Sequence, residues 1–369
     1  MLEVPFNNIF RQIEDDFSEY MRDIEQCIRD STFIGGKPVE NFERSFASAI
    51  GAEYAVSCGN GTDSLLIAMK ALDLKPGDEV IVPAMSWIST SETVTAAGGV
   101  VIFCDIDPDS YAIDTSKLES LVSVNTVGII PVHLYGHPAD LDEINKIAKK
   151  HDLWVIEDCA QAHLALYKDK PVGTFGEFGS FSFFPGKNLG AFGDAGAVVT
   201  DDIVLRDKFT RFARHGGLFK GEHLIEGHNS RLDTLQAVVL NRKLLSLTAV
   251  TEKRRHIAAI YANELKNIEG LILPTESPNV KHAWHLFVVR VTNRVDFSNF
   301  LKSNRIATGI HYPVSLPFLP AYKYKGHAGE DFPVANERQS EIVSLPLFPA
   351  MLDEQIDHVL NCVKTYFIK

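Results

Sequence analysis

The chain contains 369 residues, of which 45% are hydrophobic and 23% are charged. This length and composition allow a large buried core and predict one large domain together with a smaller one. The formal net charge of −12 and the pI near 5.5 argue against binding to a polyanion through bulk charge, and no basic block indicates a nucleic-acid footprint. A local basic pocket for a phosphate is still compatible with this composition.

The cysteines and the first residues bear on the cellular compartment. Five cysteines are scattered along the chain without a C-x-x-C pair, and several lie in or beside apolar runs. We interpret them as buried reduced thiols, not as metal ligands or disulfides. The acidic, amphipathic first residues are unlike a signal peptide, and no apolar run reaches transmembrane length. We therefore expect a cytoplasmic protein without a membrane or nucleic-acid partner.

The first part of the chain, residues 1–245, begins with a helix and then alternates between strand and helix patterns. The helical pattern of residues 14–31 predicts an arm or docking helix, and residues 33–36 predict a turn. Short apolar runs then predict strands at residues 53–57, 79–82, 100–104, 127–132, 153–156, 180–184 and 197–200. Helical patterns separate several of these runs. The alternation predicts an α/β large domain in which a mostly parallel, seven-stranded sheet lies between helices.

The pattern changes in residues 246–369. Helical stretches at residues 233–245 and 251–268 lead into this part, and beyond residue 271 we expect strands at residues 285–291 and 308–312 and a helix at residues 296–304. This mixture predicts a small α+β C-terminal domain. We therefore expect residues 1–245 to form the arm and the large domain, and a cleft to lie between the two domains.

Lys187 lies in a glycine-rich turn between two strand-like runs. Gly186 and Gly190 flank it and allow the backbone to turn tightly and to approach a ligand. In a dry pocket the pKa of a lysine falls, and its amine then becomes nucleophilic enough to form a Schiff base. The alternative interpretation is an ordinary surface lysine in a hairpin loop, so the rest of the chain has to decide between the two.

Polar residues that follow the predicted strands are the next candidates, because ligands of such sheets bind at the carboxyl ends of the strands. Gly61 and Thr62 open a helix after the first strand and could bind an anion through free N–H groups. Thr62 is equally an ordinary helix cap. Ser182 precedes Lys187 and could join the same anion site or be structural.

Asp158 and Trp87 follow two further strands. A carboxylate that directly follows a strand buried on both faces needs a positive partner or several donors, and a protonated pyridine nitrogen would serve; the alternative is a cap of the next helix. Trp87 could stack on a planar cofactor or pack in the core. Asn229 and Ser230 are plausible helix caps beside Arg231. Together the candidates offer the phosphate anchor, ring clamp, carboxylate and imine-forming amine that pyridoxal phosphate needs.

Eight motifs follow one another along the chain. They are GNGTDSL at residues 59–65, PGDEV at 76–80, PVHLYG at 131–136, IEDCAQ at 156–161, SFFPGKNLG at 182–190, RHG at 214–216, NSRLD at 229–233 and IHYP at 310–313. With these motifs the whole chain resembles the fold-type I pyridoxal-phosphate enzymes, and specifically the nucleotide-sugar aminotransferases of the DegT/StrS type.

The resemblance implies how the cofactor would be held. Lys187 would be the catalytic lysine and the covalent attachment point. Asp158 would pair with the ring nitrogen, Trp87 would stack on the ring, and Gln161 would bond the phenolic oxygen. The residues implied for the phosphate are Gly61, Thr62 and Ser182, with Asn229 supplied by the neighbouring subunit of a homodimer.

The resemblance also implies a substrate site formed by His163, His311 and Tyr312. His163 could lie over the cofactor or could equally be a satisfied core histidine. No metal is implied. The expected reaction is a two-stage transamination, in which L-glutamate leaves its nitrogen on the cofactor as pyridoxamine phosphate and a keto sugar on a nucleoside diphosphate then takes it. Lys187 would move the proton in both stages.

The form of residues 229–233 resembles enzymes that aminate carbon 3 of the sugar more than those that act at carbon 4. The product would be an amino sugar for a surface glycan, such as a lipopolysaccharide O-antigen, or for a related pathway.

A cofactor-dependent sugar dehydratase is the first alternative function, and the presence of Lys187 argues against it. A nicotinamide-dependent oxidoreductase would use Gly59 and Gly61, but the third glycine of its fingerprint is missing. A non-catalytic sensor of the cofactor or the sugar nucleotide is the third competitor.

Overall fold

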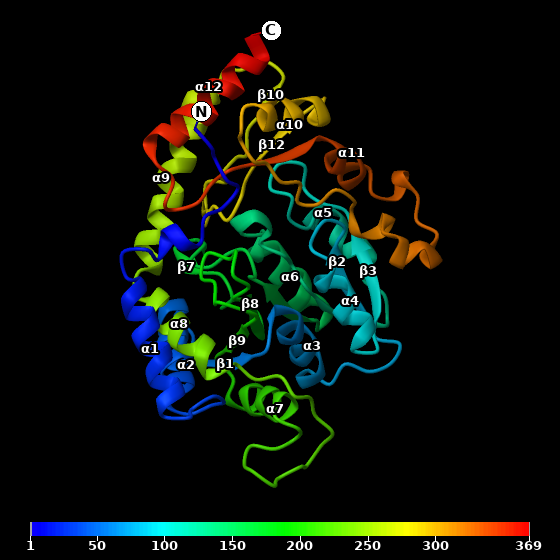
Figure 1. Ribbon diagram of the computed structural model, residues 1–369. Helices are drawn as coiled ribbons and strands as arrows, with labels where there is room; N and C mark the ends of the chain where they lie inside the picture. The colour runs from blue at the N-terminus through cyan, green and yellow to red at the C-terminus, as the bar shows by residue number, and fades with distance from the viewer. Residues whose placement is uncertain (1, 369) are drawn as a thin grey trace.

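The computed structural model describes residues 2–368 and is organised around a seven-stranded sheet with the strand order β1-β9-β8-β5-β4-β2-β3 (Figure 1). The strands are β1 (Tyr54–Cys58), β2 (Glu79–Pro83), β3 (Val100–Cys104), β4 (Thr126–Ile129), β5 (Trp154–Asp158), β8 (Phe178–Ser182) and β9 (Gly196–Thr200). Every pair from β8 across to β3 is parallel, and β9 is antiparallel to both of its neighbours. The predicted α/β fold with a mostly parallel, seven-stranded sheet is therefore confirmed.

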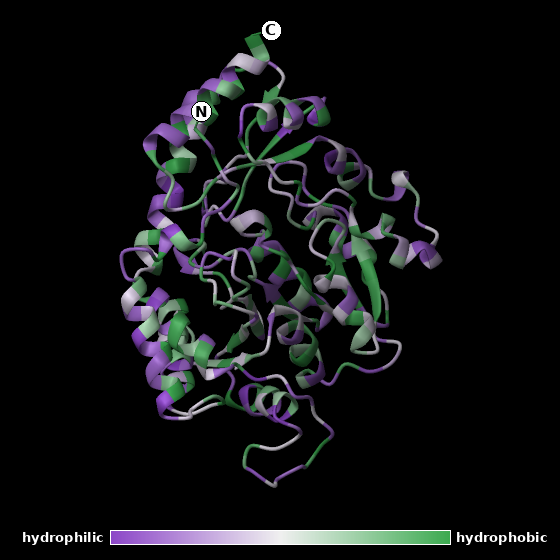
Figure 2. Ribbon diagram, in the orientation of Figure 1, coloured by the Kyte–Doolittle hydropathy of each residue, from purple (hydrophilic) through white to green (hydrophobic). Residues whose placement is uncertain are grey.

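Helices cover both faces of this sheet. They are α2 (Lys37–Ile50), α3 (Gly61–Ala71), α4 (Ser89–Ala96), α5 (Thr115–Leu118), α6 (Leu141–His151), α7 (Ile203–Ala213) and α8 (Thr234–Leu244). Successive side chains of a strand point to opposite faces, so Phe178 of β8 joins the cluster of α3 and α7, whereas Phe181 joins that of α2 and α8. Figure 2 shows the central strands as largely hydrophobic, while the surrounding helices also carry hydrophilic residues. The two-sided burial explains why the strands read as apolar runs without alternation.

The helix α2 is missing from the sequence-based prediction, which assigns no element between the turn at residues 33–36 and the first strand. Gly36 precedes the helix with φ 75°, Pro38 stands in its first turn, and Gly51 ends it in the left-handed conformation with φ 78°. Phe42 and Phe46 lie one helical turn apart and are fully buried against β8. The apolar spacing and the terminal glycines are ordinary helix signals that the turn assignment overlooked.

The C-terminal part of the chain contains a second, antiparallel sheet with the order β10-β12-β13. Its elements are β10 (Leu271–Ile272), β12 (Phe287–Val291), β13 (Ile342–Leu345), α9 (Leu247–Leu265), α10 (Arg294–Ser303), α11 (Pro333–Glu341) and α12 (Asp353–Ile368). The strand predicted at residues 308–312 is wrong, because only Gly309 forms a bridge there, to Ser344 of β13. The boundary predicted after residue 245 falls between α8 and α9 and stays a prediction.

The first residues connect the two parts of the molecule. Val4 forms a bridge to Ile306 in the C-terminal part, and α1 (Phe17–Arg29) packs against α8 beside the large sheet. A small third sheet has the order β11-β6-β7. Its strands are β11 (Val280–Lys281), β6 (Leu166–Tyr167) and β7 (Lys170–Pro171). Among residues 2–368, every helix is too short or too polar to cross a bilayer.

Candidate active site

A cavity of about 680 Å³ lies between the carboxyl ends of the central strands and the C-terminal part of the chain. Its lining includes nine of the residues singled out from the sequence, namely Gly61, Thr62, Trp87, Asp158, Gln161, Ser182, Lys187, His311 and Tyr312. Phe6 and Asn7 of the N-terminal segment also line it. The expectation that ligands bind at the carboxyl ends of the strands therefore selects residues that share one cavity.

Lys187 lies in the loop between β8 and β9, where its backbone N–H donates to the Phe184 carbonyl at 2.8 Å. Its side chain is partly buried in the cavity wall. Within residues 2–368 its amine has neither a hydrogen bond nor an ion pair. Burial lowers the pKa of the amine from 10.5 to about 8, and the Asp158 carboxylate opposes this shift. The amine thus has no partner in this part of the chain, and its pKa lies close to neutral pH.

Asp158 ends β5 and is buried at the cavity floor. Its Oδ1 accepts from the Ala160 backbone N–H at 3.1 Å, and its Oδ2 accepts from the Thr90 hydroxyl at 2.8 Å. Burial raises the pKa of the carboxyl, while these two bonds and the nearby Lys187 lower it. The sequence analysis did not identify Thr90, although a hydroxyl three residues after Trp87 on the following helix was a possible signal.

The start of α3 forms a cradle for an anion. The Asn60 side chain caps the helix by accepting from the Asp63 N–H at 2.8 Å. The N–H groups of Gly61 and Thr62 have no acceptor among the described residues and stay available in the first turn. A Cβ on Gly61 would lie 2.6 Å from the Cβ of Ser182, so only glycine permits this close approach. The cradle joins a helix N-terminus to the Ser182 hydroxyl, and this donor set fits a phosphate.

Gln161, Tyr312 and Trp87 form a second wall of the cavity. The Gln161 amide is held at both ends, because its Oε1 accepts from the Tyr135 N–H at 2.6 Å and its Nε2 donates to the Tyr312 hydroxyl at 2.9 Å. The ring of Trp87 lies 5.4 Å from that of Tyr312, and 57% of Trp87 is exposed. An aromatic face held open in this way can stack on a planar ring.

The two histidines of the predicted substrate site have different surroundings. His311 lines the cavity, shares a hydrogen bond of 2.8 Å with the Ser344 hydroxyl and stacks on Phe6, while burial lowers its pKa to about 4. His163 is fully buried between Phe181 and Phe183 and is not among the described residues that line the cavity. Burial lowers the pKa of His163 to about 3. This position favours the core interpretation for His163, but neither ring nitrogen has a hydrogen-bond partner within the described chain.

Asn229 lies on the exposed segment before α8, and it is not among the described residues that line the cavity of its own chain. The neighbouring Ser230 is buried, and its hydroxyl accepts from the Gly59 N–H at 2.9 Å and donates to Asp63 at 2.6 Å. Ser230 therefore holds Gly59 and Asp63, which flank the start of α3, in place. It does not act as the helix cap suggested by the sequence, because Asp233 stands at the N-cap of α8.

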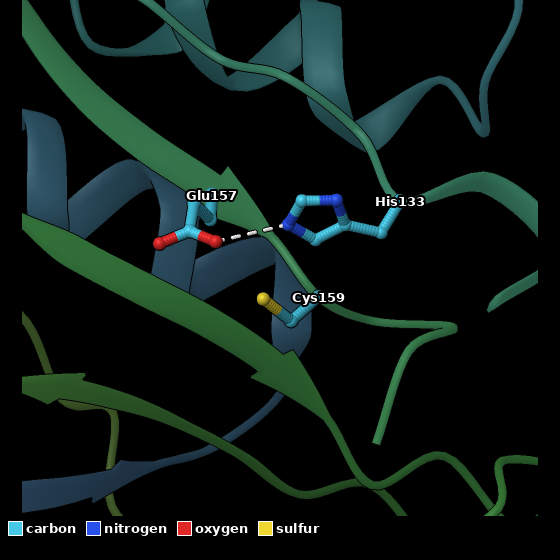
Figure 3. A group of neighbouring side chains, drawn as sticks. All are labelled: His133, Glu157 and Cys159. Atoms are coloured by element: carbon cyan, nitrogen blue, oxygen red, sulfur yellow. Dashed lines mark hydrogen bonds and ion pairs between the residues drawn. The ribbon is translucent and has the colours of Figure 1, made fainter. Parts of the chain in front are cut away.

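A buried group beneath the cavity, His133, Glu157 and Cys159, has atoms spaced as metal ligands could be (Figure 3). His133 Nδ1 accepts from the Ala139 N–H at 3.0 Å, so Nε2 carries the proton and donates to Glu157 at 3.0 Å. Glu157 also accepts from three backbone N–H groups, those of Gly173, Phe175 and Gly176. Hydrogen bonds therefore account for the positions of His133 and Glu157 without an ion.

The family model described as the DegT/DnrJ/EryC1/StrS aminotransferase family matches residues 14–364. The chain belongs to this family. Residues of five of the eight motifs, those at 59–65, 131–136, 156–161, 182–190 and 310–313, line the cavity. The family assignment makes the chain a pyridoxal-phosphate-dependent sugar aminotransferase.

Three relatives indicate the range of known roles. The chain is 41% identical to a dTDP-3-amino-3,6-dideoxy-alpha-D-galactopyranose transaminase of Aneurinibacillus thermoaerophilus, over 98% of this chain and 99% of the relative. It is 39% identical to a UDP-N-acetyl-3-dehydro-alpha-D-glucosamine 3-aminotransferase of Acidithiobacillus ferrooxidans, over 94% and 93%. A protein of Geobacillus stearothermophilus named a pleiotropic regulatory protein is 38% identical over 99% of both chains.

Two solved structures share the fold over the whole of this chain. DesV of S. venezuelae, in complex with a ketimine intermediate, matches with a TM-score of 0.97 at 34% identity and is itself covered completely. NtdA of Bacillus subtilis, with bound pyridoxamine phosphate, matches with a TM-score of 0.93 at 31% identity over 86% of its length. The residues of this chain fit the same cofactor, because the Gly61–Ser182 cradle, the anchored Asp158 and the free Lys187 amine surround one cavity.

Proposed function

We propose that this enzyme transfers the amino group of L-glutamate to a keto sugar linked to a nucleoside diphosphate, and that the reacting position is carbon 3. The observation that carries the proposal is the free Lys187 amine beside Asp158 in a cavity with a phosphate cradle. Two relatives, one named for a dTDP sugar and one for a UDP sugar, both carry a 3-amino designation. An amino sugar on a nucleotide carrier is a suitable precursor for a surface glycan.

Each residue has a definite task in this reaction. The bound cofactor supplies an electron-withdrawing ring that stabilises negative charge at the reacting carbon. Asp158, held by Thr90 and Ala160, keeps a proton on the ring nitrogen, because a buried carboxylate favours a positive partner. The Lys187 amine, with a pKa of about 8, can take a proton from the substrate carbon and return it near neutral pH. Gln161 orients the ring through an amide that is already fixed.

The direct test is a panel of keto sugars assayed with L-glutamate. We expect a 3-keto sugar nucleotide to give an amino sugar, which NMR would locate at carbon 3, and the Lys187→Ala variant to lose turnover by several orders of magnitude. Amination at carbon 4 would replace the carbon-3 proposal, and loss of a hydroxyl without amination would support the dehydratase. A purified wild-type protein that binds the cofactor but aminates no keto sugar would support a non-catalytic sensor. The Geobacillus relative is named a regulatory protein.

We further propose that the enzyme is a homodimer in which Asn229 completes the cradle of the partner's site. Asn229 is exposed and outside its own cavity, and Figure 1 shows the segment between α7 and α8 as a long loop extending away from the sheet. Phe219 and Leu224 on this loop are 76% and 67% exposed, which favours a surface covered by another protein chain.

Mixed dimers test this arrangement. Lys187→Ala and Asn229→Ala subunits, each impaired alone, would together form a site in which Lys187 and Asn229 are both intact. Random exchange would then restore about a quarter of the wild-type activity, because half of the dimers are mixed and one of their two sites is complete. No recovery on mixing would indicate that each subunit uses its own Asn229.

A further inference from the structure

Asn188, the residue after Lys187, connects the loop between β8 and β9 to the C-terminal part of the chain. It is buried, and its side-chain amide is bonded at both ends. Its Nδ2 donates to the Ala283 carbonyl at 3.0 Å. Because a carbonyl can only accept, the amide oxygen of Asn188 is the atom that faces Nδ1 of His285, at 3.1 Å. Asn188 therefore fixes the loop that carries Lys187 against His285.

The contact with Asn188 determines which nitrogen of His285 carries a hydrogen. Since the Asn188 oxygen accepts, Nδ1 of His285 donates, and Nε2 keeps its lone pair in the neutral ring. Burial lowers the pKa of His285 well below its usual value, and the positive charge of Lys187 lowers it further. The imidazole is thus neutral near pH 7, and its Nε2 is a hydrogen-bond acceptor.

Nε2 of His285 opens into the cavity. His285 is partly buried and lines the cavity together with Lys187. Within residues 2–368, Nε2 forms no hydrogen bond, and it is not among the unpaired side-chain atoms that are sealed from solvent. The backbone of His285 is fixed, because its N–H donates to the Tyr135 carbonyl at 2.9 Å and its carbonyl accepts from Arg254 at 3.2 Å. The cavity therefore contains a neutral acceptor in a fixed position.

Lys187 is the donor that the surroundings of His285 indicate. Its charge affects the pKa of His285 more than that of Arg254, although Arg254 is bonded to the His285 backbone, so the Lys187 amine lies close to the ring. The amine has no partner of its own within the described chain, and the flexible four-carbon stem of a lysine allows it to turn toward Nε2. Asp158 is a less available acceptor, because it already accepts from Thr90 and from a backbone N–H.

We propose that His285, oriented by Asn188, positions the Lys187 amine while this amine is detached from the cofactor. When the amine takes a proton from the substrate carbon it becomes an ammonium, and one of its three N–H groups then donates to Nε2 of His285. The other two N–H groups stay directed at the reacting atoms, and the proton returns from the ammonium without passing to His285. The inference rests on the proposed transamination and adds to it the two residues that hold its proton carrier in place.

Nitrogen NMR of the cofactor-free chain with ¹⁵N-labelled histidine tests the state of the imidazole without turnover. The signals that are missing from His285→Phe or His285→Gln belong to His285. We expect a neutral ring with its hydrogen on Nδ1 at pH 7. A hydrogen on Nε2, or a protonated ring at this pH, would overturn the inference.

The conversion of the cofactor by L-glutamate in a single turnover tests the effect on Lys187. We expect His285→Phe to slow this step by about 10- to 100-fold, the usual effect of losing a hydrogen bond to a charged group. Its affinity for L-glutamate should change by less than about threefold. L-Glutamate deuterated at the α-carbon should show a larger isotope effect in this variant, because proton removal becomes slower. His285→Gln, whose amide oxygen can reach the place of Nε2, should recover most of the rate.

His282→Phe is the matched control. His282 is a buried imidazole three residues earlier, and it is not among the described residues that line the cavity. This variant should change the rate by less than about threefold. Equal slowing in His282→Phe, or an unchanged isotope effect in His285→Phe, would assign the loss to disturbed packing and overturn the inference.

Two further results separate folding and function from this role. Thermal midpoint and cofactor content report whether each variant is folded, and the NMR measurement on the wild-type chain with His285→Gln decides if His285→Phe does not fold. An enzyme that meets these expectations with L-glutamate but aminates no keto sugar would reject the proposed function alone.

Discussion

The lowered pKa of Lys187 makes a prediction about the cofactor-free chain. At pH 7, an amine with a pKa of about 8 is about one-tenth unprotonated, whereas an ordinary lysine with a pKa of 10.5 is about one part in 3000 unprotonated. We therefore expect Lys187 to react with a dilute acylating reagent about 300-fold faster at pH 7 than its ordinary pKa would allow. The rate should rise tenfold per pH unit and become constant above about pH 8.

Site-resolved mass spectrometry of chains labelled between pH 6 and pH 11 would measure this profile. Lys243 is the matched comparison, because burial also lowers its pKa to about 8, yet its amine donates to the Gly190 carbonyl at 2.7 Å and does not line the cavity. Asp158→Asn should move the Lys187 profile to lower pH, since the carboxylate raises the pKa of the amine. A Lys187 rate that still increases through pH 10 would refute the reasoning.

The same shift affects stability. Because the pKa of Lys187 is lower in the folded chain than in the unfolded chain, the unfolded state binds more protons between about pH 8 and 10.5, and the contribution of Lys187 to stability rises over that range. At pH 7 the charged amine costs at most about 3 to 4 kcal/mol, from 1.36 kcal/mol per pKa unit. Denaturant unfolding of the cofactor-free Lys187→Met variant at pH 7 should show a free energy of unfolding above that of the wild type. The increase should be smaller than this upper bound, because Asp158 loses its attraction to the amine.

Three further substitutions test separate parts of the site. Gly61→Ala places a Cβ 2.6 Å from that of Ser182 and should weaken cofactor binding at least about tenfold in a spectroscopic titration. Thr90→Val removes the hydroxyl that donates to Asp158, so we expect a further rise in the pKa of that carboxyl. The ring nitrogen of the bound cofactor should then lose its proton at a lower pH than in the wild type, which a pH titration of the cofactor absorbance would measure. Glu157→Gln puts an amide among N–H donors and should lower the free energy of unfolding by about 3 to 5 kcal/mol, measured with denaturant.

Much of the site could be predicted because its residues stand at strand ends, which the apolar runs reveal. Asp158 is the last residue of β5, Lys187 lies in the loop after β8, and Gly61 opens the helix after β1. Arg254, which lines the cavity from α9, was missed because it stands in the charged run EKRR at residues 252–255. Its spacing from Ile257, Ala258 and Tyr261, three, four and seven residues later, was the available signal for a buried face.

The prediction was weakest where distant segments decide the conformation. The run at residues 308–312 has strand-like composition, but the pairing partner Ser344 meets only Gly309, so no strand forms. The location of His163 likewise depends on α2, whose Phe42 and Phe46 pack with Phe181 and Phe183 around it. Because α2 was absent from the prediction, nothing in the neighbourhood of His163 could distinguish a core position from a cavity position.

The charges of the cavity support a site that is completed by anions. Lys187 and Arg254 are buried or partly buried cations, and Asp158 is the one buried carboxylate among the described residues of the lining. The start of α3 adds the positive end of a helix. A chain with a formal charge of −12 thus concentrates positive potential at one internal place. Such a site gains stability from each anion it binds, so phosphate and a dicarboxylate together should raise the thermal midpoint of the cofactor-free chain more than either does alone.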